Sequence, residues 1–254
     1  MDNLVKTKIS EGKTVFGPWI ETGSVDNAEI LAHVGFDMIM VDGEHGAMSL
    51  ETAGKLISHI KSTDTVPLIR VPGNDIWVVK QGLDAGPKGI MIPMINSKEE
   101  AELAIQYCTY PPRGVRGVGT GRACVFGNKL DEYVEFTRTG LIKILQIEHF
   151  KAVEDIDGIL SVDGIDVAFL GPYDLSLSMG IMGDMNHPDM HKAFVKVLDA
   201  CKRHNVTPGI MTSPGMIQKH AEMGFRFLLG GVDSMLLFNA AKSCLEEFQG
   251  VQNR

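Results

Sequence analysis

The sequence predicts an α/β fold, a closed (β/α)8 barrel, and three observations lead to this prediction. Short apolar or β-branched runs alternate with amphipathic stretches of helical period, and the alternation occurs eight times. The apolar runs are nearly continuous, as expected of parallel strands that helices cover on both faces. The chain has 254 residues, a length that suits one barrel of about 250 residues. No linker of Gly, Pro and Ser divides it, so residues 1–254 are predicted to be a single domain.

Strands are predicted in the apolar runs, and helices are predicted between them. The predicted strands are Val15–Ile20, Phe36–Val41, Pro67–Val71, Gly89–Ile95, Leu141–Ile147, Ile165–Leu170, Thr207–Met211 and Phe225–Gly230. The helix after the second strand is predicted to begin at Ser49, and the one after the fourth strand at Ser97, because serine caps helix N-termini. Strict alternation of strands and helices, repeated eight times, favours a closed barrel over an open sheet.

Composition and charge exclude several classes of protein. The net charge of −8 and the absence of a Lys/Arg run argue against nucleic-acid binding. No apolar run approaches the roughly 18 residues of a membrane span, so no membrane partner is expected. The polar start MDNLVKTKISEGK lacks the apolar core of a secretory signal, so we expect a cytoplasmic protein that acts on small molecules. The cysteines show no CxxC spacing and predict neither disulfides nor a thiolate metal site: Cys108, Cys124, Cys201 and Cys244.

Ionisable side chains follow the predicted strands, as expected if the active site lies at the C-terminal ends of barrel strands. They are Asp42, Glu44 and His45 after the second strand, Arg70 at the third, Glu148 and His149 at the fifth, and Asp174 beyond the sixth. The strand beginnings carry few groups that could react. This asymmetry predicts that one end of the barrel carries the chemistry.

Glu148 and Asp174 follow neighbouring strands and are candidate ligands of one divalent cation. Two carboxylates without a histidine ligand favour Mg²⁺ or Mn²⁺ over a structural zinc ion. The alternative is that each carboxylate is a solvated loop acid or one member of an ion pair. These residues alone do not separate the two interpretations.

His45 and Arg70 are candidates for the reaction itself. Histidine titrates near neutrality and is the usual general base, and a carboxylate such as Asp42 can fix its tautomer. Arginine offers a planar set of donors that suits an enolate or carboxylate oxygen. A structural role for His45 remains the alternative. His149 could point to the other face of its strand or bond a neighbouring loop, and six histidines are expected to be structural or exposed: His33, His59, His187, His191, His204 and His220.

A segment rich in glycine and arginine, YPPRGVRGVGTGRACVFG at residues 110–127, lies between the fourth and fifth predicted strands. It lacks the GK[ST] ending of a phosphate-binding loop, so neither nucleotide fingerprint is satisfied. Two interpretations remain. It is either a flexible loop over the barrel mouth that touches an anionic substrate, or a structural excursion.

Six segments together resemble a known family. VDGEHG, RVPGND, GLDAGPKGIMIPMINSKEEAE, YPPRGVRG, LQIE and DGIDVAFLGPYDLSLSMG are similar to the signatures of the HpcH/HpaI family of metal-dependent class II 2-oxo-acid (pyruvate) aldolases. The resemblance runs from about residue 15 to residue 240, in order and at similar spacing. It implies a barrel of the phosphoenolpyruvate/pyruvate-binding type. It also implies a homo-oligomer, a trimer or hexamer, in which the last helix packs on a neighbouring subunit.

The resemblance also implies roles for individual residues. The cation, Mg²⁺ or Mn²⁺ with Co²⁺ as a further option, would be bound by Glu148 and Asp174. Catalysis would involve His45 as base, Arg70 as the group that stabilises the enolate, and the acids Asp42 and Asp84, the second reaching across a subunit boundary. The substrate would contact Gln146 and the backbone around Gly171, Pro172 and Tyr173.

The implied reaction is reversible cleavage of a 4-hydroxy-2-oxo acid to pyruvate and an aldehyde, in carbohydrate or aromatic acid catabolism. His45 would deprotonate the C4 hydroxyl through a water, and the enolate left by C3–C4 cleavage would be protonated to pyruvate. One alternative is a related lyase or decarboxylase acting on oxaloacetate or a citramalate-like substrate. Another is a non-catalytic barrel, which would have lost one of these groups, and none is lost. Gly46-Ala47-Met48, Pro87, His149 and Tyr173 depart from the family pattern.

Overall fold

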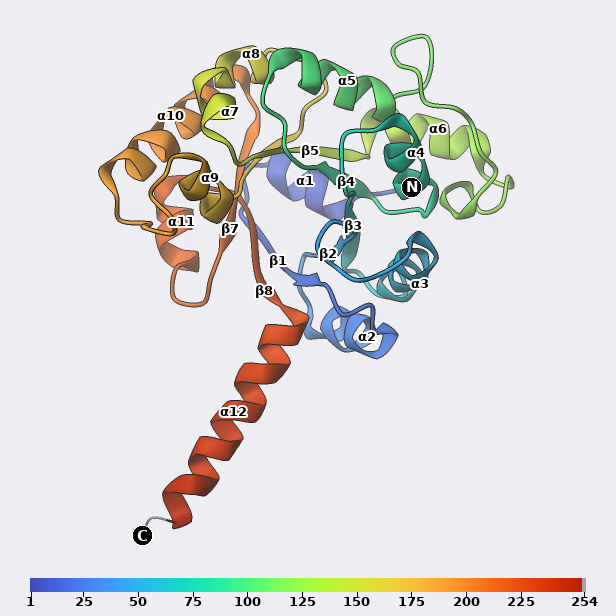
Figure 1. The fold of residues 1–254 in the computed structure, drawn as a ribbon. Coiled ribbons are helices and arrows are strands. Elements are labelled where there is room, and N and C mark those ends of the chain that lie inside the picture. The colour runs from blue at the N-terminus through green and yellow to red at the C-terminus, as the bar shows by residue number, and fades with distance from the viewer. Residues whose placement is uncertain (253–254) are drawn as a thin grey trace.

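Eight parallel strands close into one barrel in the order of the chain, in a computed structural model that describes residues 1–252 (Figure 1). The strands are β1 (Val15–Ile20), β2 (Met38–Asp42), β3 (Val66–Arg70), β4 (Gly89–Ile92), β5 (Ile142–Ile147), β6 (Val167–Leu170), β7 (Thr207–Thr212) and β8 (Phe227–Val232). The predicted (β/α)8 barrel is therefore confirmed. The largest error at a single boundary is the end of β4, which stops before Pro93 because proline has no N–H to donate to the ladder, and β8 begins and ends two residues later than predicted.

Helices connect successive strands and cover the outside of the barrel. They are α1 (Leu4–Ser10), α2 (Val25–Val34), α3 (Leu50–Ile60), α4 (Ile76–Asp84), α5 (Lys98–Cys108), the 3-10 turn η1 (Arg122–Cys124), α6 (Leu130–Thr139), α7 (Phe150–Glu154), α8 (Ile156–Leu160), α9 (Pro172–Ser178), α10 (Pro188–His204), α11 (Ile217–Met223) and α12 (Asp233–Gln252). The two predicted caps are confirmed. The Ser49 side chain accepts the amide N–H of Thr52, and that of Ser97 accepts the N–H of Glu100.

The barrel interior is apolar up to its C-terminal end. Side chains alternate across each strand, so Met38 and Met40 of β2 and Ile142 and Ile144 of β5 fill the interior. Helix α1 contributes Val5 to the same cluster and closes the end where the strands begin. The inward-facing positions that follow these on β2 and β5, toward the C-terminal end of each strand, are polar. These positions form the mouth of the barrel.

The segment 110–127 does not lie over the mouth of its own barrel. It follows the C-terminal end of α5, which lies at the end of the barrel where strands begin, and α6 separates it from β5. Arg116 is buried there, with its guanidinium 4.7 Å from the ring of Tyr110 and 5.3 Å from that of Tyr133. Arg122 donates to the hydroxyl of Ser58 at 2.9 Å. The prediction of a loop over the mouth is therefore wrong for this chain, and the structural excursion is the better interpretation.

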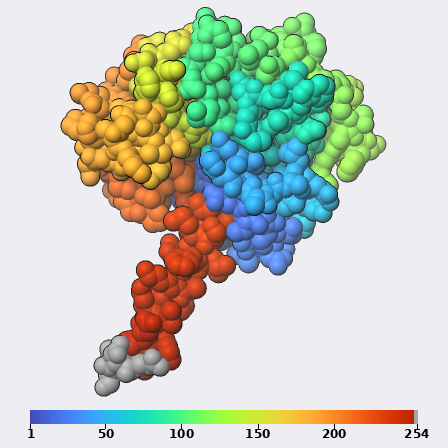
Figure 2. All heavy atoms as spheres, in the orientation of Figure 1, coloured from blue at the N-terminus to red at the C-terminus, as the bar shows by residue number. Residues whose placement is uncertain are grey.

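Helix α12 projects from the barrel as a separate rod (Figures 1 and 2). Its apolar side chains are exposed, and they are Met235, Leu236, Leu237, Phe238, Leu245, Phe248 and Val251. Among the described residues, no helix combines the length and apolar character that crossing a bilayer requires. Cys108, Cys124 and Cys201 are buried free thiols, and Cys244 is an exposed one.

Candidate active site

Asp42 and Arg70 form a buried pair at the mouth of the barrel. Arg70 Nε donates to Asp42 Oδ1 at 2.9 Å, and Nη2 donates to Oδ2 at 2.6 Å. The guanidinium also lies 4.5 Å from the centre of the Trp19 ring. Burial lowers the pKa of Arg70, but the hydrogen bonds and charge of Asp42, with the charges of Glu44 and Glu148, outweigh burial and raise it. Arg70 is therefore held as a fixed cation that faces the mouth.

Asp42 does not contact the imidazole of His45, although the sequence suggested that it orients this ring. Its Oδ1 accepts the backbone amides of Glu44, at 3.0 Å, and of His45, at 3.3 Å. Both carboxylate oxygens are occupied by Arg70, which leaves neither directed at the ring. Asp42 thus fixes the backbone that carries His45, and the predicted contact with the imidazole is corrected.

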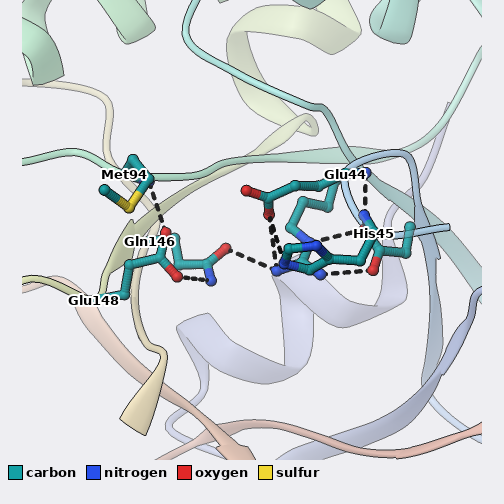
Figure 3. Close-up of polar contacts among 7 residues, drawn as sticks. Glu44, His45, Met94, Gln146 and Glu148 are labelled. Carbon is teal, nitrogen blue, oxygen red and sulfur yellow. Dashed lines mark hydrogen bonds and ion pairs between the residues drawn. The ribbon is translucent and has the colours of Figure 1, made fainter. Parts of the chain in front are cut away.

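Glu44 is the carboxylate that stands nearest to the His45 ring. Its Oε2 lies 4.0 Å from His45 Nε2 and 3.0 Å from Arg70 Nη1. Burial, together with the charges of Asp42 and Asp174, raises the pKa of Glu44 despite Arg70 and His45. The His45 side chain is 65% exposed, so its ring is open to a ligand at the mouth. Figure 3 shows Glu44 and His45 on one side of the site and Gln146 and Glu148 on the other.

Glu148 is a buried carboxylate with few partners. Its Oε1 accepts the Met94 amide at 2.8 Å, and its Oε2 accepts the Gln146 side-chain amide. Burial raises the pKa of Glu148 to about 6, and the charges of Glu44 and Asp174 act in the same direction. Met94 has a φ of 55°, a left-handed conformation that costs energy for a residue other than glycine. The strained backbone after β4 thus directs one N–H at this carboxylate.

Gly171 leaves room for the Glu148 side chain. A Cβ at position 171 would lie 3.0 Å from both Cβ and Oε2 of Glu148 and 3.3 Å from Gln146 Nε2. Pro172 then begins α9, and the exposed Tyr173 and Asp174 follow in its first turn. Asp174 raises the pKa of both Glu44 and Glu148, so its charge reaches the same site.

A metal site made only of protein groups is not evident. Among residues 1–252, no group of three or more His, Cys, Asp or Glu side chains is arranged to hold a metal ion. The pair Glu148 and Asp174 remains, with Glu44 and Gln146 nearby. Two carboxylates and an amide are oxygen donors of the kind that Mg²⁺ takes, with water at its other positions.

Asp84 is not brought to His45 within one chain. It ends α4, and its Oδ1 accepts Arg116 Nη2 at 2.8 Å, at the end of the barrel opposite the mouth. Helices of a barrel run antiparallel to the strands, so the end of a helix lies far from the ends of strands. The predicted participation of Asp84 therefore needs a second chain.

The structure also assigns structural roles to histidines. His149 caps the N-terminus of α7 through its Nδ1, which accepts the amide of Lys151 at 3.2 Å. His220 is buried, with Nδ1 2.8 Å from Thr212 Oγ1. Sequence reasoning gave no role to Glu44 or Met94. Glu44 lies in the same charged segment as Asp42 and His45, and this position in the sequence could have identified it. Met94 acts through its backbone N–H, which its side-chain type does not predict.

Comparison with known proteins agrees with this geometry. The profile of the family described as "HpcH/HpaI aldolase/citrate lyase" matches residues 16–240. The hydroxypyruvate/pyruvate aldolase of Roseobacter denitrificans is 38% identical over 95% of this chain and 95% of its own. The 4-hydroxy-2-oxo-heptane-1,7-dioate aldolase of Salmonella dublin is 33% identical over 100% of this chain and 97% of its own.

A solved structure supports the same assignment. The crystal structure of an HpcH/HpaI aldolase/citrate lyase family protein from Burkholderia cenocepacia superposes with a TM-score of 0.93 at 31% identity, and covers 97% of this chain and 99% of that one. The family profile and the relatives match nearly the whole chain, and the structure has a barrel with a polar mouth. Together they confirm the resemblance found in the sequence. The protein is an enzyme of the lyase class and belongs to the HpcH/HpaI aldolase/citrate lyase family.

Proposed function

We propose that this enzyme is a divalent-cation-dependent aldolase that cleaves a 4-hydroxy-2-oxo acid to pyruvate and an aldehyde. The observation that carries this proposal is the mouth of the barrel, where the buried acid Glu148 faces the fixed cation Arg70 and the open imidazole of His45. The names of the relatives from Roseobacter and Salmonella support the reaction class.

Glu148 and Asp174 would hold the cation. Burial and neighbouring acids raise the pKa of Glu148 to about 6, a situation that a positive charge at the site would reverse. A bound Mg²⁺ or Mn²⁺ supplies Lewis acidity, which polarises the 2-oxo group and offsets the negative charge of the enolate. Gly171 keeps the space beside the carboxylate open, and the backbone from Gly171 to Tyr173 would receive the substrate carboxylate.

Arg70 would stabilise the oxygen on which negative charge develops. Asp42 holds the guanidinium from one side through Nε and Nη2. Nη1 points to the mouth, 3.0 Å from Glu44 and 3.5 Å from Gln146 Oε1. A donor held in place before the reaction loses little free energy to reorganisation when the charge appears.

His45 would accept the proton of the C4 hydroxyl, directly or through a water. Its ring is exposed at the mouth and its backbone is fixed by Asp42. Glu44, 4.0 Å away, is the side chain in this chain that would stabilise the protonated ring. Glu44 would then take, beside the base, the role that the sequence assigned to Asp42.

The experiment is a coupled assay of pyruvate release from a panel of 4-hydroxy-2-oxo acids, with and without a chelator. Oxaloacetate is assayed in parallel to test decarboxylation, and hydroxypyruvate is tested as a donor in the reverse direction. We expect cation-dependent release, reduced by about 10²-fold or more in His45→Ala and Glu148→Gln, with His33→Ala as the exposed control. The proposal fails if no substrate yields cation-dependent pyruvate, or if His45→Ala retains full activity.

We also propose that the chain forms a homo-oligomer, a trimer or hexamer, in which α12 packs on a neighbouring copy. Leu237, Phe248 and Val251 lie on one strip of α12 and are 66%, 56% and 68% exposed. Ile30 and Val34 on α2 are 63% and 62% exposed and provide apolar surface on the barrel. An isolated, uncovered helix with such a strip gains little stability on its own. Such an assembly would also let Asp84 approach the mouth of another barrel.

Light scattering on the full chain tests this assembly. The double variant Leu237→Asp and Phe248→Asp is expected to lower the molar mass to that of smaller species, because charge opposes burial of the strip. Lys242→Asp, a change of charge elsewhere on the same helix, is expected to leave the mass unchanged. A monomeric wild-type protein, or an unchanged mass in the double variant, contradicts the proposed contact.

A further inference from the structure

A cavity with charged residues in its wall lies at the end of the barrel opposite the mouth. It has a volume of about 370 Å³, and its wall includes Lys143, Arg113, Arg138, Tyr110, Glu102 and Asp163. Lys143 is the second residue of β5, and Asp163 lies in the turn before β6, so the cavity is at the end where these strands begin. None of the residues of the candidate active site contributes to it.

Lys143 is a buried cation whose ammonium has no direct partner. Its neighbours Ile142 and Ile144 fill the barrel interior, so Lys143 points outward, and only 7% of it is exposed. Among the described residues its ammonium has no hydrogen bond and no ion pair. Asp166 is the nearest candidate, but its Oδ2 accepts the backbone N–H of Lys143 at 2.8 Å and its Oδ1 binds Lys6 at 3.0 Å.

The surrounding charges do not offset the burial of Lys143. Burial lowers its pKa most strongly, Asp166 and Cys108 oppose that effect in part, Lys6 and Arg113 act with burial, and the pKa remains lowered. A charged group that is buried without a partner is costly, and an anion supplied from solution would offset that cost. Lys143 thus lacks within the chain the partner that its position requires.

Other groups on the wall of the cavity indicate which chemical groups such a ligand would carry. Arg113 and Arg138 are exposed at the rim. A guanidinium can bind a phosphate or carboxylate through two hydrogen bonds, and Arg113 is the better candidate because Arg138 Nη1 already lies 3.4 Å from Glu135 Oε2. The buried hydroxyl of Tyr110 has no hydrogen-bond partner. Glu102 and Asp163 are acceptors that suit hydroxyl groups and disfavour a ligand that is anionic along its whole length.

We propose that this cavity binds a small hydroxylated metabolite with a phosphate or carboxylate at one end. The anionic end would lie against Lys143 and Arg113, and the hydroxyl groups would lie toward Glu102 and Asp163. The volume of about 370 Å³ falls within the range of small-molecule sites, about 300–1,000 Å³. The site is independent of the proposed aldolase reaction, because it shares no residue with the mouth.

Calorimetric titration of the full-length protein tests the site, with glycerol 3-phosphate and glycerate as separate probes and glycerol as the uncharged control. A chelator is present and ionic strength is held constant. We expect at least one anion to bind, and its affinity to fall about tenfold or more in Lys143→Met and in Arg113→Met. Lys192→Met, which changes an exposed lysine of α10, and Glu148→Gln at the mouth are expected to bind as the wild type does.

The outcomes separate the possibilities. Binding of one probe alone identifies the phosphate or the carboxylate as the recognised group, and binding of both shows that the oxyanion itself is recognised. Arg113→Met keeps the test decisive if Lys143→Met does not fold, because Arg113 is exposed. The proposal is overturned if neither anion binds, if affinity is unchanged in Arg113→Met, or if Glu148→Gln abolishes binding and so locates the probe at the mouth.

Discussion

Replacement of Asp42 by Asn tests the buried pair that organises the mouth. The side chain keeps its shape, but it loses its charge and presents an NH₂ group to one of the two Arg70 nitrogens. Asp42 is 0% exposed, and the Arg70 side chain is 9% exposed. The variant therefore leaves a buried guanidinium without its principal counterion and places two donors in contact.

The expected loss of stability follows from the burial of the Asp42–Arg70 pair. Removal of one partner from a buried ion pair costs about 3–5 kcal/mol, because the remaining charge is unpaired. Glu44 still lies 3.0 Å from Arg70 Nη1, so we expect the lower end, about 3 kcal/mol. Each kcal/mol shifts the Tm of a chain of this size by about 2–4 °C, which gives a decrease of about 6–12 °C.

Urea unfolding and calorimetry at a fixed protein concentration measure this change, and a double-mutant cycle with Arg70→Met isolates the pair. Asp157→Asn is the matched control, since Asp157 pairs with Arg203 at 2.8 Å through a similar arrangement at the surface. Both side chains of that pair are about half exposed, and solvent screens their interaction. The control should unfold almost as the wild type does.

Two results would refute this reasoning. If Asp42→Asn is no more destabilising than Asp157→Asn, burial does not govern the pair. If the destabilisations of Asp42→Asn and Arg70→Met are additive, Asp42 does not act through Arg70. The expected cycle is strongly non-additive, with the double variant more stable than the sum of the single changes implies.

Three further variants follow from the site and the segment 110–127. In the cation-free protein the pKa of Glu148 is about 6 against an ordinary 4.5, so between these values the folded state binds more protons than the unfolded state. Stability should therefore fall by about 2 kcal/mol as pH rises from about 3.5 to about 7. Unfolding measured across this range should lose that slope in Glu148→Gln, and added Mg²⁺ should suppress it in the wild type. Gly171→Ala places a methyl 3.0 Å from the Glu148 carboxylate and should lower kcat/KM by about 10²-fold with little change in Tm. Gly73→Ala, whose methyl meets nothing within 4 Å, should change neither kcat/KM nor Tm. Equal kcat/KM in the two variants would show that the close approach at Gly171 is unimportant. Gly114→Ala directs a methyl to 2.2 Å from the carbonyl oxygen of Thr109 and should destabilise by about 1–3 kcal/mol in chemical denaturation, and a wild-type midpoint would mean that this turn relaxes freely.

The periodicity of the chain was enough to predict the barrel. Parallel strands covered on both faces must be apolar along their length, so each is visible as a run of residues, and serine at positions 49 and 97 identified two helix starts from local hydrogen bonding alone. The end of β4 was predicted less well. Pro93 and the left-handed Met94 stop the ladder there, and nothing in the apolar pattern distinguishes Met94 from a strand residue.

The polar residues of the mouth could be identified as a set but not as pairs. Their place after apolar runs predicted that Asp42, His45, Arg70 and Glu148 share one end of the barrel. The sequence suggested Asp42 as the partner of His45, because the two are close in the chain. In the structure Asp42 and Arg70 are directly opposite on neighbouring strands, and their pairing leaves Glu44 beside the imidazole.

The sequence by itself determined the class of fold, the end of the barrel that carries the chemistry, and the family, because periodicity and the order of motifs are properties of the chain. Tertiary structure decided which carboxylate faces which cation, where the segment 110–127 packs, and that Asp84 is remote from His45 within one chain. It also showed an unpaired Lys143 beside a cavity and an uncovered α12. These depend on strand register and on the antiparallel course of the helices, which bring together residues that no local pattern relates.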